Sequence, residues 1–480
     1  MVKKDFPTIH FYDQDFVDIY EQTWAWIRDY WQDPATQTEE DPFGVRFFCS
    51  PDATQVNLMD AVFSTFFLVY SNRVYNAAQQ LDGFYNRQEY SGAIRSDYLL
   101  ATGKPIFTKA NPEGISPPLL AWAEYNLYHK AGNKKRIKEI MPTLEAYYRW
   151  LEESFKDESG MYHVPLAATG MPNAPRDGMY YAVDFNIQQA MNSAHMALLG
   201  HILNDKDIEF RYRRQYFSLK TRINQLMWNE EDGFYYDLDK NQEQVRVKTI
   251  ASFWALLTDI PNEVRSRAMI DHLKDPEGFG TENPFPTVAV NEPSFSENGD
   301  GWRGSVFPTY TFMIIKGLEK QHQWEMAREY AIRHLYSILD TLHPEGNKRG
   351  NVWEAYRPTK EGHAKWSGHP DFPRAMHLPS VGLSTVALMI ENVVGLSVSL
   401  PRKTVRWVVP TLEIMGIENL NLRIVGKLIS ERNREAAVGE EFYLYHRDDR
   451  GSRRAGGALA GYLTTYTRES NRSGLLRNQL

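Results

Sequence analysis

The sequence predicts an all-α domain, built as a ring of helical hairpins and followed by a small β-rich appendage. Residues 14–396 repeatedly show helical periodicity, in approximately twelve segments. Short links alternate with long loops, as expected where antiparallel helical hairpins are joined to one another by long connections. After Gly395 the pattern changes to alternating and β-branched stretches. Although 480 residues could hold several domains, helical barrels and toroids use such a length as one unit.

The predicted helices are segments in which apolar residues recur every three or four positions, separated by stretches rich in Gly, Pro, Asn and Asp. They are expected near residues 14–32, 57–70, 72–88, 116–131, 135–155, 184–203, 207–229, 248–257, 261–274, 304–320, 322–341 and 378–395.

The connections between these helices differ greatly in length. NDKD (204–207) barely separates two helices, whereas residues 275–303 form a long Pro/Gly-rich loop. Long loops gathered at one end of a helical ring build a pocket. We therefore expect one acidic, aromatic mouth, formed by the loops around 41–60, 90–115, 165–184, 275–303 and 350–377.

The C-terminal part is predicted to be a small sheet. KTVRWVVP (403–410), LNLRIVGKLISER (420–432) and EEFYLYHR (440–447) are β-branched or alternating, with turn residues between them. The predicted division is a helical domain over 1–398, a β-rich segment over 399–450 and an irregular or disordered tail over 451–480.

Composition narrows the class of function. Trp, Tyr and Phe make up 13% of the chain; most must pack the core, but such rings also stack on the apolar faces of sugars. A net charge of −7 makes nucleic acid a poor partner. Cys49 is the single cysteine, so no intrachain disulfide is expected. Without a signal-peptide pattern or a long apolar run, the sequence predicts a cytoplasmic protein that does not bind membranes.

Two loops combine charge with aromatic rings. In VWEAYRP (352–358), Glu354 lies between Trp353 and Tyr356, and a carboxylate with aromatic walls is a plausible base. In DGWRGSVFP (300–308), Arg303 follows Trp302. The guanidinium group can donate hydrogen bonds to a carboxylate or to sugar hydroxyl groups, and the neighbouring indole ring can stack on a sugar. A surface glutamate and a structural salt bridge are the respective alternatives.

Two aspartates stand at the start of apolar helices. Asp60 and Asp184 are candidates for a polar site, although helix capping and the helix dipole also explain Asp at such positions. The thirteen histidines show no metal-ligand spacing, and no Gly-rich phosphate loop is present. We therefore expect no metal and no cofactor.

Several blocks, taken in order, resemble glycoside hydrolase family 63 and its mannosylglycerate- and glucosylglycerate-hydrolase relatives, which are related to trehalases. SPPLLAWAEYNLY (116–128) is similar to the family's P-P-L-x-A-W-A helix, GWRGSVFP (301–308) to its W-R-G-P-x-W-P loop, and VWEAYRP to its W-E-x-Y-x-P loop. QLMWNEEDGFYYDLD (225–239) resembles a helix-end hairpin of six-hairpin glycosidases. The resemblance extends from about residue 40 to 430.

This resemblance implies an (α/α)6 barrel and inverting hydrolysis of an α-glycosidic bond in a small glycoside or oligosaccharide. In that reaction one carboxyl group protonates the leaving oxygen while another activates water from the opposite face of the sugar. Glu354 falls on the family's general base. Met59–Asp60 stands where relatives have W-D, so the carboxylate for sugar hydroxyls is kept and a stacking ring is absent. The residues expected to contact substrate are Asp60, Asn173, Arg176, Trp302, Arg303, Trp353, Tyr356 and Trp366.

The general acid does not match the family. Relatives carry a G-M-D-N-S-P-R-like loop, whereas this chain has GMPNAPR, with Pro172 at the position of the acid. Three explanations remain open. A neighbouring carboxyl group replaces the acid; or the leaving group of the substrate needs little protonation or is protonated by the substrate's own carboxylic acid; or the chain is a non-catalytic carbohydrate-binding relative. Asp177 is the candidate acid, and Asp184 is the alternative acid or a sugar ligand. A sugar epimerase or a polysaccharide lyase with a similar helical toroid fold is a further class of function.

Overall fold

The computed structural model describes residues 5–32, 43, 46–50, 53–71, 74–342, 350–402, 404–407, 415–418, 420, 426–430, 443–448 and 451–452. Within these ranges the fold is mostly helical. None of the described helices combines the length and the apolar character that crossing a bilayer requires.

The twelve predicted helices all correspond to helical segments of the structure. Their bounds are α1 (Gln14–Asp29), α2 (Leu58–Leu68), α3 (Gln79–Tyr85), α4 (Leu120–Ala131), α5 (Lys134–Phe155), α6 (Val183–Leu203), α7 (Lys206–Arg222), the 3-10 segment η5 (Ile250–Leu257), α8 (Glu263–Lys274), α9 (Pro308–Lys320), α10 (Trp324–Leu342), and α11 (Leu378–Gly382) with its π-helical continuation η6 (Leu383–Val393).

Several helices begin later than predicted, for local reasons. Helix α9 begins at Pro308, because Pro favours the first helical position and Val306 pairs in extended form with Tyr356. Helix α4 begins at Leu120, after two consecutive prolines. The segment predicted at 72–88 is helical only over Gln79–Tyr85 among its described residues.

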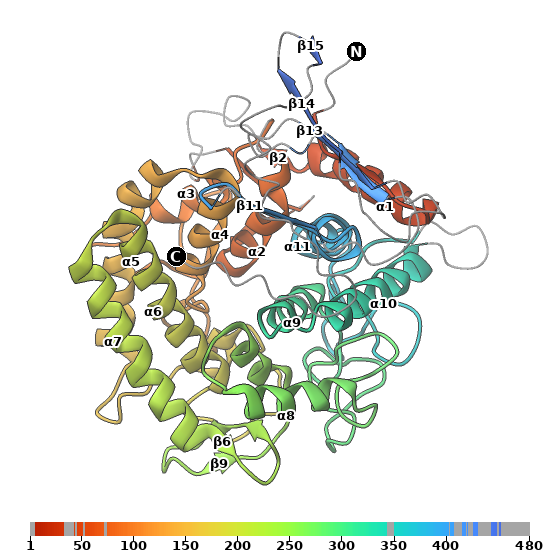
Figure 1. Ribbon diagram of the computed structural model, residues 1–480. Helices are drawn as coiled ribbons and strands as arrows, with labels where there is room; N and C mark the ends of the chain where they lie inside the picture. The colour runs from red at the N-terminus through yellow and green to blue at the C-terminus, as the bar shows by residue number, and fades with distance from the viewer. Residues whose placement is uncertain are drawn as a thin grey trace.

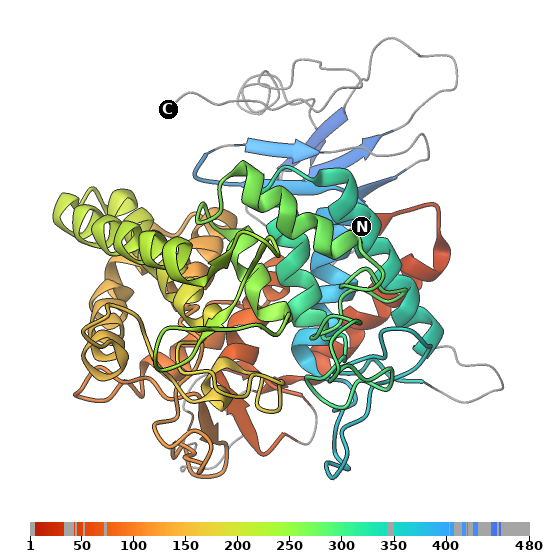
Figure 2. The same cartoon turned by 90° about the horizontal axis from the view of Figure 1, so that it is seen from below.

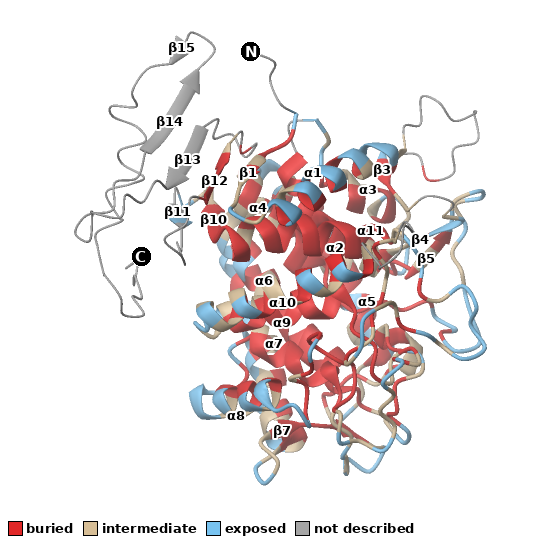
Figure 3. Ribbon diagram, turned by 90° about the vertical axis from the view of Figure 1, so that its right-hand side faces the viewer, coloured by how far each residue is buried: buried red, intermediate tan, exposed pale blue. Residues whose placement is uncertain are grey.

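The helical segments form an inner layer and an outer one (Figure 1). In chain order α2, α4, α6, η5, α9 and α11–η6 each contact the next, and α11 also packs on α2. The inner segments are buried on nearly all sides, as α2 and α6 illustrate. Helix α2 is mostly apolar, whereas α6 also buries polar side chains such as Asp184, Asn186 and Gln188. The outer helices, such as α5, are amphipathic and have one exposed face (Figure 3).

Aromatic side chains fill the centre of the inner layer. Phe66 of α2 lies 4.4 Å from the Trp122 ring of α4, which in turn lies 5.9 Å from Trp254 of η5. Phe312 of α9 contacts Phe66 at a centroid distance of 5.3 Å. These rings account for part of the high aromatic content and occupy the interior beneath the loops.

The long loops meet at one end of the helices, while the strands that follow α11 lie at the other (Figure 2). Loop residue Lys365 bonds to the backbone of Asn298 and Gly301. The short strands β4 (Gln55–Asn57) and β5 (Asp97–Leu99) pair antiparallel between two further loops. The larger of the two described cavities, about 240 Å³, lies elsewhere, beside the C-terminal end of α4, and Glu354 is not among its lining residues.

The sheet of the appendage includes the N-terminal end of the chain. Strand β1 (Thr8–His10) pairs antiparallel with β12 (Met415–Glu418), a contact that the sequence did not predict. The order continues through β13 (Gly426–Ser430), β14 (Tyr443–Asp448) and β15 (Gly451–Ser452), and β10 (Leu396–Ser399) pairs with β11 (Thr404–Trp407). The three predicted strands correspond to β11, β13 and β14. Of the tail predicted as irregular over 451–480, Gly451 and Ser452 form β15, and the residues from 453 onward lie outside the described residues.

Three further hairpins are short. They are β2 (Trp31–Gln32) with β3 (Phe47–Phe48), β6 (Trp228–Asn229) with β7 (Phe234–Tyr235), and β8 (Asp237–Leu238) with β9 (Gln244–Val245). The second of these is the hairpin expected within residues 225–239.

Candidate active site

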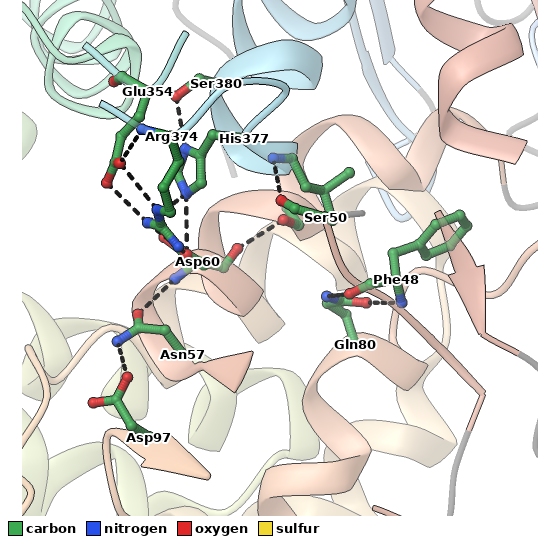
Figure 4. Close-up of polar contacts among 12 residues, drawn as sticks. Phe48, Ser50, Asn57, Asp60, Gln80, Asp97, Glu354, Arg374, His377 and Ser380 are labelled. Atoms are coloured by element: carbon green, nitrogen blue, oxygen red, sulfur yellow. Dashed lines mark hydrogen bonds and ion pairs between the residues drawn. The ribbon is translucent and has the colours of Figure 1, made fainter. Parts of the chain in front are cut away.

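Glu354 is held by Arg374, a residue 20 positions later in the chain (Figure 4). Arg374 Nε donates to Glu354 Oε2 at 2.9 Å, and Nη2 donates to Oε1 at 2.8 Å. The backbone completes the contact, because Arg374 N–H donates to Oε2 at 3.1 Å and Glu354 N–H donates to Arg374 O at 2.9 Å. The Glu354 side chain is 12% exposed, so its carboxylate is largely enclosed but still reachable.

Asp60 lies beside the same guanidinium group. Arg374 Nη2 is 3.3 Å from Asp60 Oδ2, and His377 Nε2 is 3.0 Å from that oxygen. His377 is fixed in turn by Ser380, whose hydroxyl lies 2.9 Å from Nδ1. The first turn of α2 sets the backbone of Asp60, because the Asn57 side chain caps the helix by accepting from Asp60 N–H at 3.1 Å.

The charges around these two carboxyl groups keep both ionised. Burial alone raises the pKa of Asp60, but His377 and Arg374 outweigh it and lower the value to about 2. Burial likewise raises the pKa of Glu354, while the charge and hydrogen bonds of Arg374 lower it below the usual value of a glutamate. An ionised Glu354 is suited to accept a proton, whereas an ionised Asp60 is suited to bind hydroxyl groups.

A third carboxyl group, Asp97, is joined to this cluster through Asn57. Asn57 Nδ2 donates to Asp97 Oδ1 at 2.8 Å, and the two residues are direct partners in the β4–β5 pair. Burial raises the pKa of Asp97 above the usual value, although hydrogen bonds from Asn57 and Ser96 oppose the rise. Asp97 therefore differs from Asp60 and Glu354, whose pKa values are lowered.

The loop that contains Pro172 is tied to the loop around Trp302. The Asn173 side chain accepts from Trp302 N–H at 2.7 Å and donates to Asp300 O at 2.9 Å, while Arg303 Nε donates to Asn173 O at 3.2 Å. Pro172 itself is exposed. The structure thus brings the predicted residues Asn173, Trp302 and Arg303 together, with the Asn173 amide used for loop-to-loop contact.

Arg176 and Asp184 have a different position from the one expected of sugar ligands. The Arg176 guanidinium group is fully buried and donates to both oxygens of Asp184, at 2.8 and 2.9 Å, and to both oxygens of Asp237, at 2.6 and 2.8 Å. Neither Arg176 nor Asp184 exposes its side chain. Because their polar atoms are satisfied inside the protein, they fix the start of α6. Asp177, the candidate acid, is exposed on the same loop.

The predicted aromatic residues divide into two groups. Trp302 and Trp366 are partly exposed and form an edge-to-face pair with centroids 5.5 Å apart, joined by Phe372. Trp353, next to Glu354, is also partly exposed. Tyr356 differs from expectation, because it is 1% exposed and its hydroxyl group accepts from Trp353 N–H at 2.9 Å, so it supports the loop from inside.

The sequence interpretation did not include Arg374, His377, Asn57 or Asp97. Arg374 and His377 occur in DFPRAMHLP, directly before the apolar helix α11, and charged residues at such a boundary were a usable signal. Asp97 has no comparable signal in the sequence. Among the described residues, no three His, Cys, Asp or Glu side chains are grouped so that they could hold a metal ion.

A model of the mannosylglycerate hydrolase MGH1-like glycoside hydrolase domain matches residues 77–373, more than half of the chain. The chain belongs to this glycoside hydrolase family. The match includes Asp97, Pro172 and Glu354. Residues 395–443 match the C-terminal domain of trehalase, which covers β10 to the beginning of β14.

Relatives of the family agree with the resemblance to glycoside hydrolase family 63. An uncharacterized protein from Borreliella burgdorferi is 47% identical to the chain, over 88% of this chain and 89% of that protein. The family 63 mannosylglycerate hydrolase from Thermus thermophilus, solved with Tris and D-glycerate, is 17% identical, with a TM-score of 0.61 over 77% of this chain and 99% of that one. Neutral trehalase from Saccharomyces cerevisiae is 13% identical, with a TM-score of 0.56 over 72% and 73%. The fold is therefore similar to the six-hairpin glycosidases of these families.

Proposed function

We propose that this protein hydrolyses an α-glycosidic bond in a small glycoside or oligosaccharide, with inversion at the anomeric carbon. The observation that carries the proposal is the placement of Glu354, an ionised and still reachable carboxylate, beside Asp60 where the long loops meet. Membership of a glycoside hydrolase family supports a carbohydrate as the substrate.

We also propose that the helices form a closed (α/α)6 barrel. The support is the cyclic order of the inner segments, in which α2, α4, α6, η5, α9 and α11 follow one another and α11 returns to α2. In such a barrel the loops before the inner helices form one rim, and Glu354 and Asp60 belong to it.

The proposed roles follow from charge and exposure. Glu354 takes a proton from a water molecule, whose oxygen attacks the anomeric carbon. Asp60, held ionised by Arg374 and His377, accepts hydrogen bonds from sugar hydroxyl groups. Trp302, Trp353, Trp366 and Arg303 are the remaining candidates for contact with the sugar.

A non-catalytic carbohydrate-binding protein is the second candidate. Pro172 has no ionisable group, and both oxygens of Glu354 already accept hydrogen bonds from Arg374, which are the two observations that favour it. Such a protein binds sugar and releases no product. An epimerase or lyase would act without Glu354 as a hydrolytic base.

The test is a screen of α-glucosides, α-mannosides and glycerate-linked sugars, followed by NMR of the first product released. Hydrolysis with inversion gives the β-anomer before mutarotation. Release of the α-anomer contradicts the inverting assignment, and saturable binding without any product supports the second candidate.

A further inference from the structure

The proposed function requires a proton donor opposite Glu354, and the carboxyl groups of Asp60 and Asp184 are unsuited to that role. Asp60 Oδ2 and Glu354 Oε1 both contact Arg374 Nη2, so they cannot be more than about 6 Å apart, less than the 6.5–9.5 Å of an inverting pair. Asp60 is also held ionised by two neighbours. Asp184 is fully buried against Arg176.

Asp97 is the next carboxyl group along the same row. Figure 4 shows Glu354, Asp60 and Asp97 in sequence, with Arg374 between the first two and Asn57 between the last two. The Asn57 side chain fixes both acidic residues, because its oxygen caps the backbone at Asp60 and its amide binds Asp97. Asp97 is thus positioned by the same short strand and helix start that position Asp60.

The charges around Asp97 differ from those around Asp60 and Glu354. Asp60 and Glu354 each contact Arg374, but in the described ranges no Lys, Arg or His side chain forms an ion pair with Asp97. It is partly buried, and burial and the charge of Asp60 raise its pKa, whereas hydrogen bonds from Asn57 and Ser96 and the charge of Arg374 oppose the rise. Carboxyl groups whose surroundings move their pKa values in opposite directions are the usual pairing of acid and base in an active site.

We propose that Asp97 is the general acid of this enzyme and supplies the proton that Pro172 cannot. The proposal rests on the glycosidase function proposed above. As the anomeric carbon–oxygen bond breaks, the leaving oxygen takes the Asp97 proton and departs as an alcohol. Water forms the new bond to the anomeric carbon and gives one proton to Glu354, so that Asp97 ends ionised and Glu354 protonated. Exchange of protons with solvent restores both.

The test compares substrates that differ only in how much their leaving group needs a proton. Methyl and 4-nitrophenyl α-glycosides of the sugar that the wild-type protein cleaves are the probes. Asp97→Asn is expected to lower kcat/KM for the methyl glycoside about 100-fold or more, and to affect the 4-nitrophenyl glycoside far less. The fall in kcat/KM at high pH, which reports ionisation of the acid, is expected to disappear.

Three variants complete the comparison. Asp97→Glu retains an acid and should keep the fall at high pH, which provides a second test if Asp97→Asn unfolds. Glu113→Gln removes a carboxyl group from the same loop, one that is 59% exposed and pairs with Arg95, and should behave as wild type. Asp177→Asn tests the competing candidate from the Pro172 loop.

The proposal is overturned if Asp97→Asn keeps wild-type rates on both probes, or if both Asp97 variants lose activity on the two probes to the same extent. It is also overturned if Asp177→Asn is the variant that loses activity on the methyl glycoside far more than on the 4-nitrophenyl glycoside. Failure of the underlying function has a different signature. In that case the wild-type protein itself releases no sugar, or releases the α-anomer, before any Asp97 variant is compared.

Discussion

Arg374 binds Glu354 through both side-chain nitrogens that face it, at 2.9 and 2.8 Å, and the nitrogen that contacts Oε1 also lies 3.3 Å from Asp60. One cation therefore contributes to the charge of both carboxylates, and His377 acts with it at Asp60. Its side chain is 49% exposed, so the cation borders the space open to substrate.

Replacement of Arg374 should change the pH dependence of catalysis. Because the charge of Arg374 lowers the pKa of Glu354, Arg374→Ala should raise that pKa. The fall in kcat/KM on the acidic side should then occur at a higher pH than in the wild-type protein. The measurement is kcat/KM from pH 3 to 8. Arg267→Ala, which removes an exposed partner of Glu263 on α8, is the control and should not change the pH profile. If the acidic side of the pH profile is the same in Arg374→Ala as in the wild-type protein, Arg374 does not keep Glu354 ionised.

Asp60 should stabilise the fold in a pH-dependent way. Its pKa is about 2 in the folded protein, below the value of about 3.9 expected in the unfolded chain. Ionisation therefore stabilises the fold at pH above 4, and the contribution is lost as the pH falls towards 2. Asp60→Asn should lower the free energy of unfolding by about 2 kcal/mol at pH 6, with a smaller difference near pH 3.

Urea unfolding at several pH values measures this difference. Asp177→Asn is the control, since Asp177 is exposed. If the difference in free energy of unfolding between wild type and Asp60→Asn grows as the pH is lowered, the predicted pH dependence is wrong.

The buried group around Arg176 should matter for stability rather than for sugar binding. Arg176→Ala leaves the buried Asp184 and Asp237 without their cation and should cost about 3–5 kcal/mol in free energy of unfolding. Arg267→Ala, on the surface, should cost less than about 1 kcal/mol. If Arg176→Ala has the same urea midpoint of unfolding as the wild-type protein but a lower affinity for sugar, Arg176 is a sugar ligand and its proposed structural role is wrong.

The sequence predicted the helices because their apolar faces are periodic, and α1 and α5 show this most clearly. It did not predict that β1 pairs with β12, since that pairing joins residues about 400 positions apart and a three-residue strand has little periodicity.

The site was predicted in part for similar reasons. Glu354 has aromatic neighbours within its own heptapeptide, so a local motif identified it. Arg374 reaches Glu354 only because the intervening loop folds back, with Trp353 pairing to Ala375. Arg176 and Asp184 had the residue types of a sugar site, and only three-dimensional burial shows that they pair with each other.

The central claim is that Glu354 activates water for inverting hydrolysis, and its most direct test is Glu354→Gln on the best substrate of the screen, with the product followed by NMR. Glutamine cannot take a proton from water but is nearly the same size. We expect the wild-type protein to release the β-anomer first, and Glu354→Gln to lose at least about 100-fold in kcat. Turnover that survives in Glu354→Gln, or an α-anomer released first by the wild-type protein, would contradict the account.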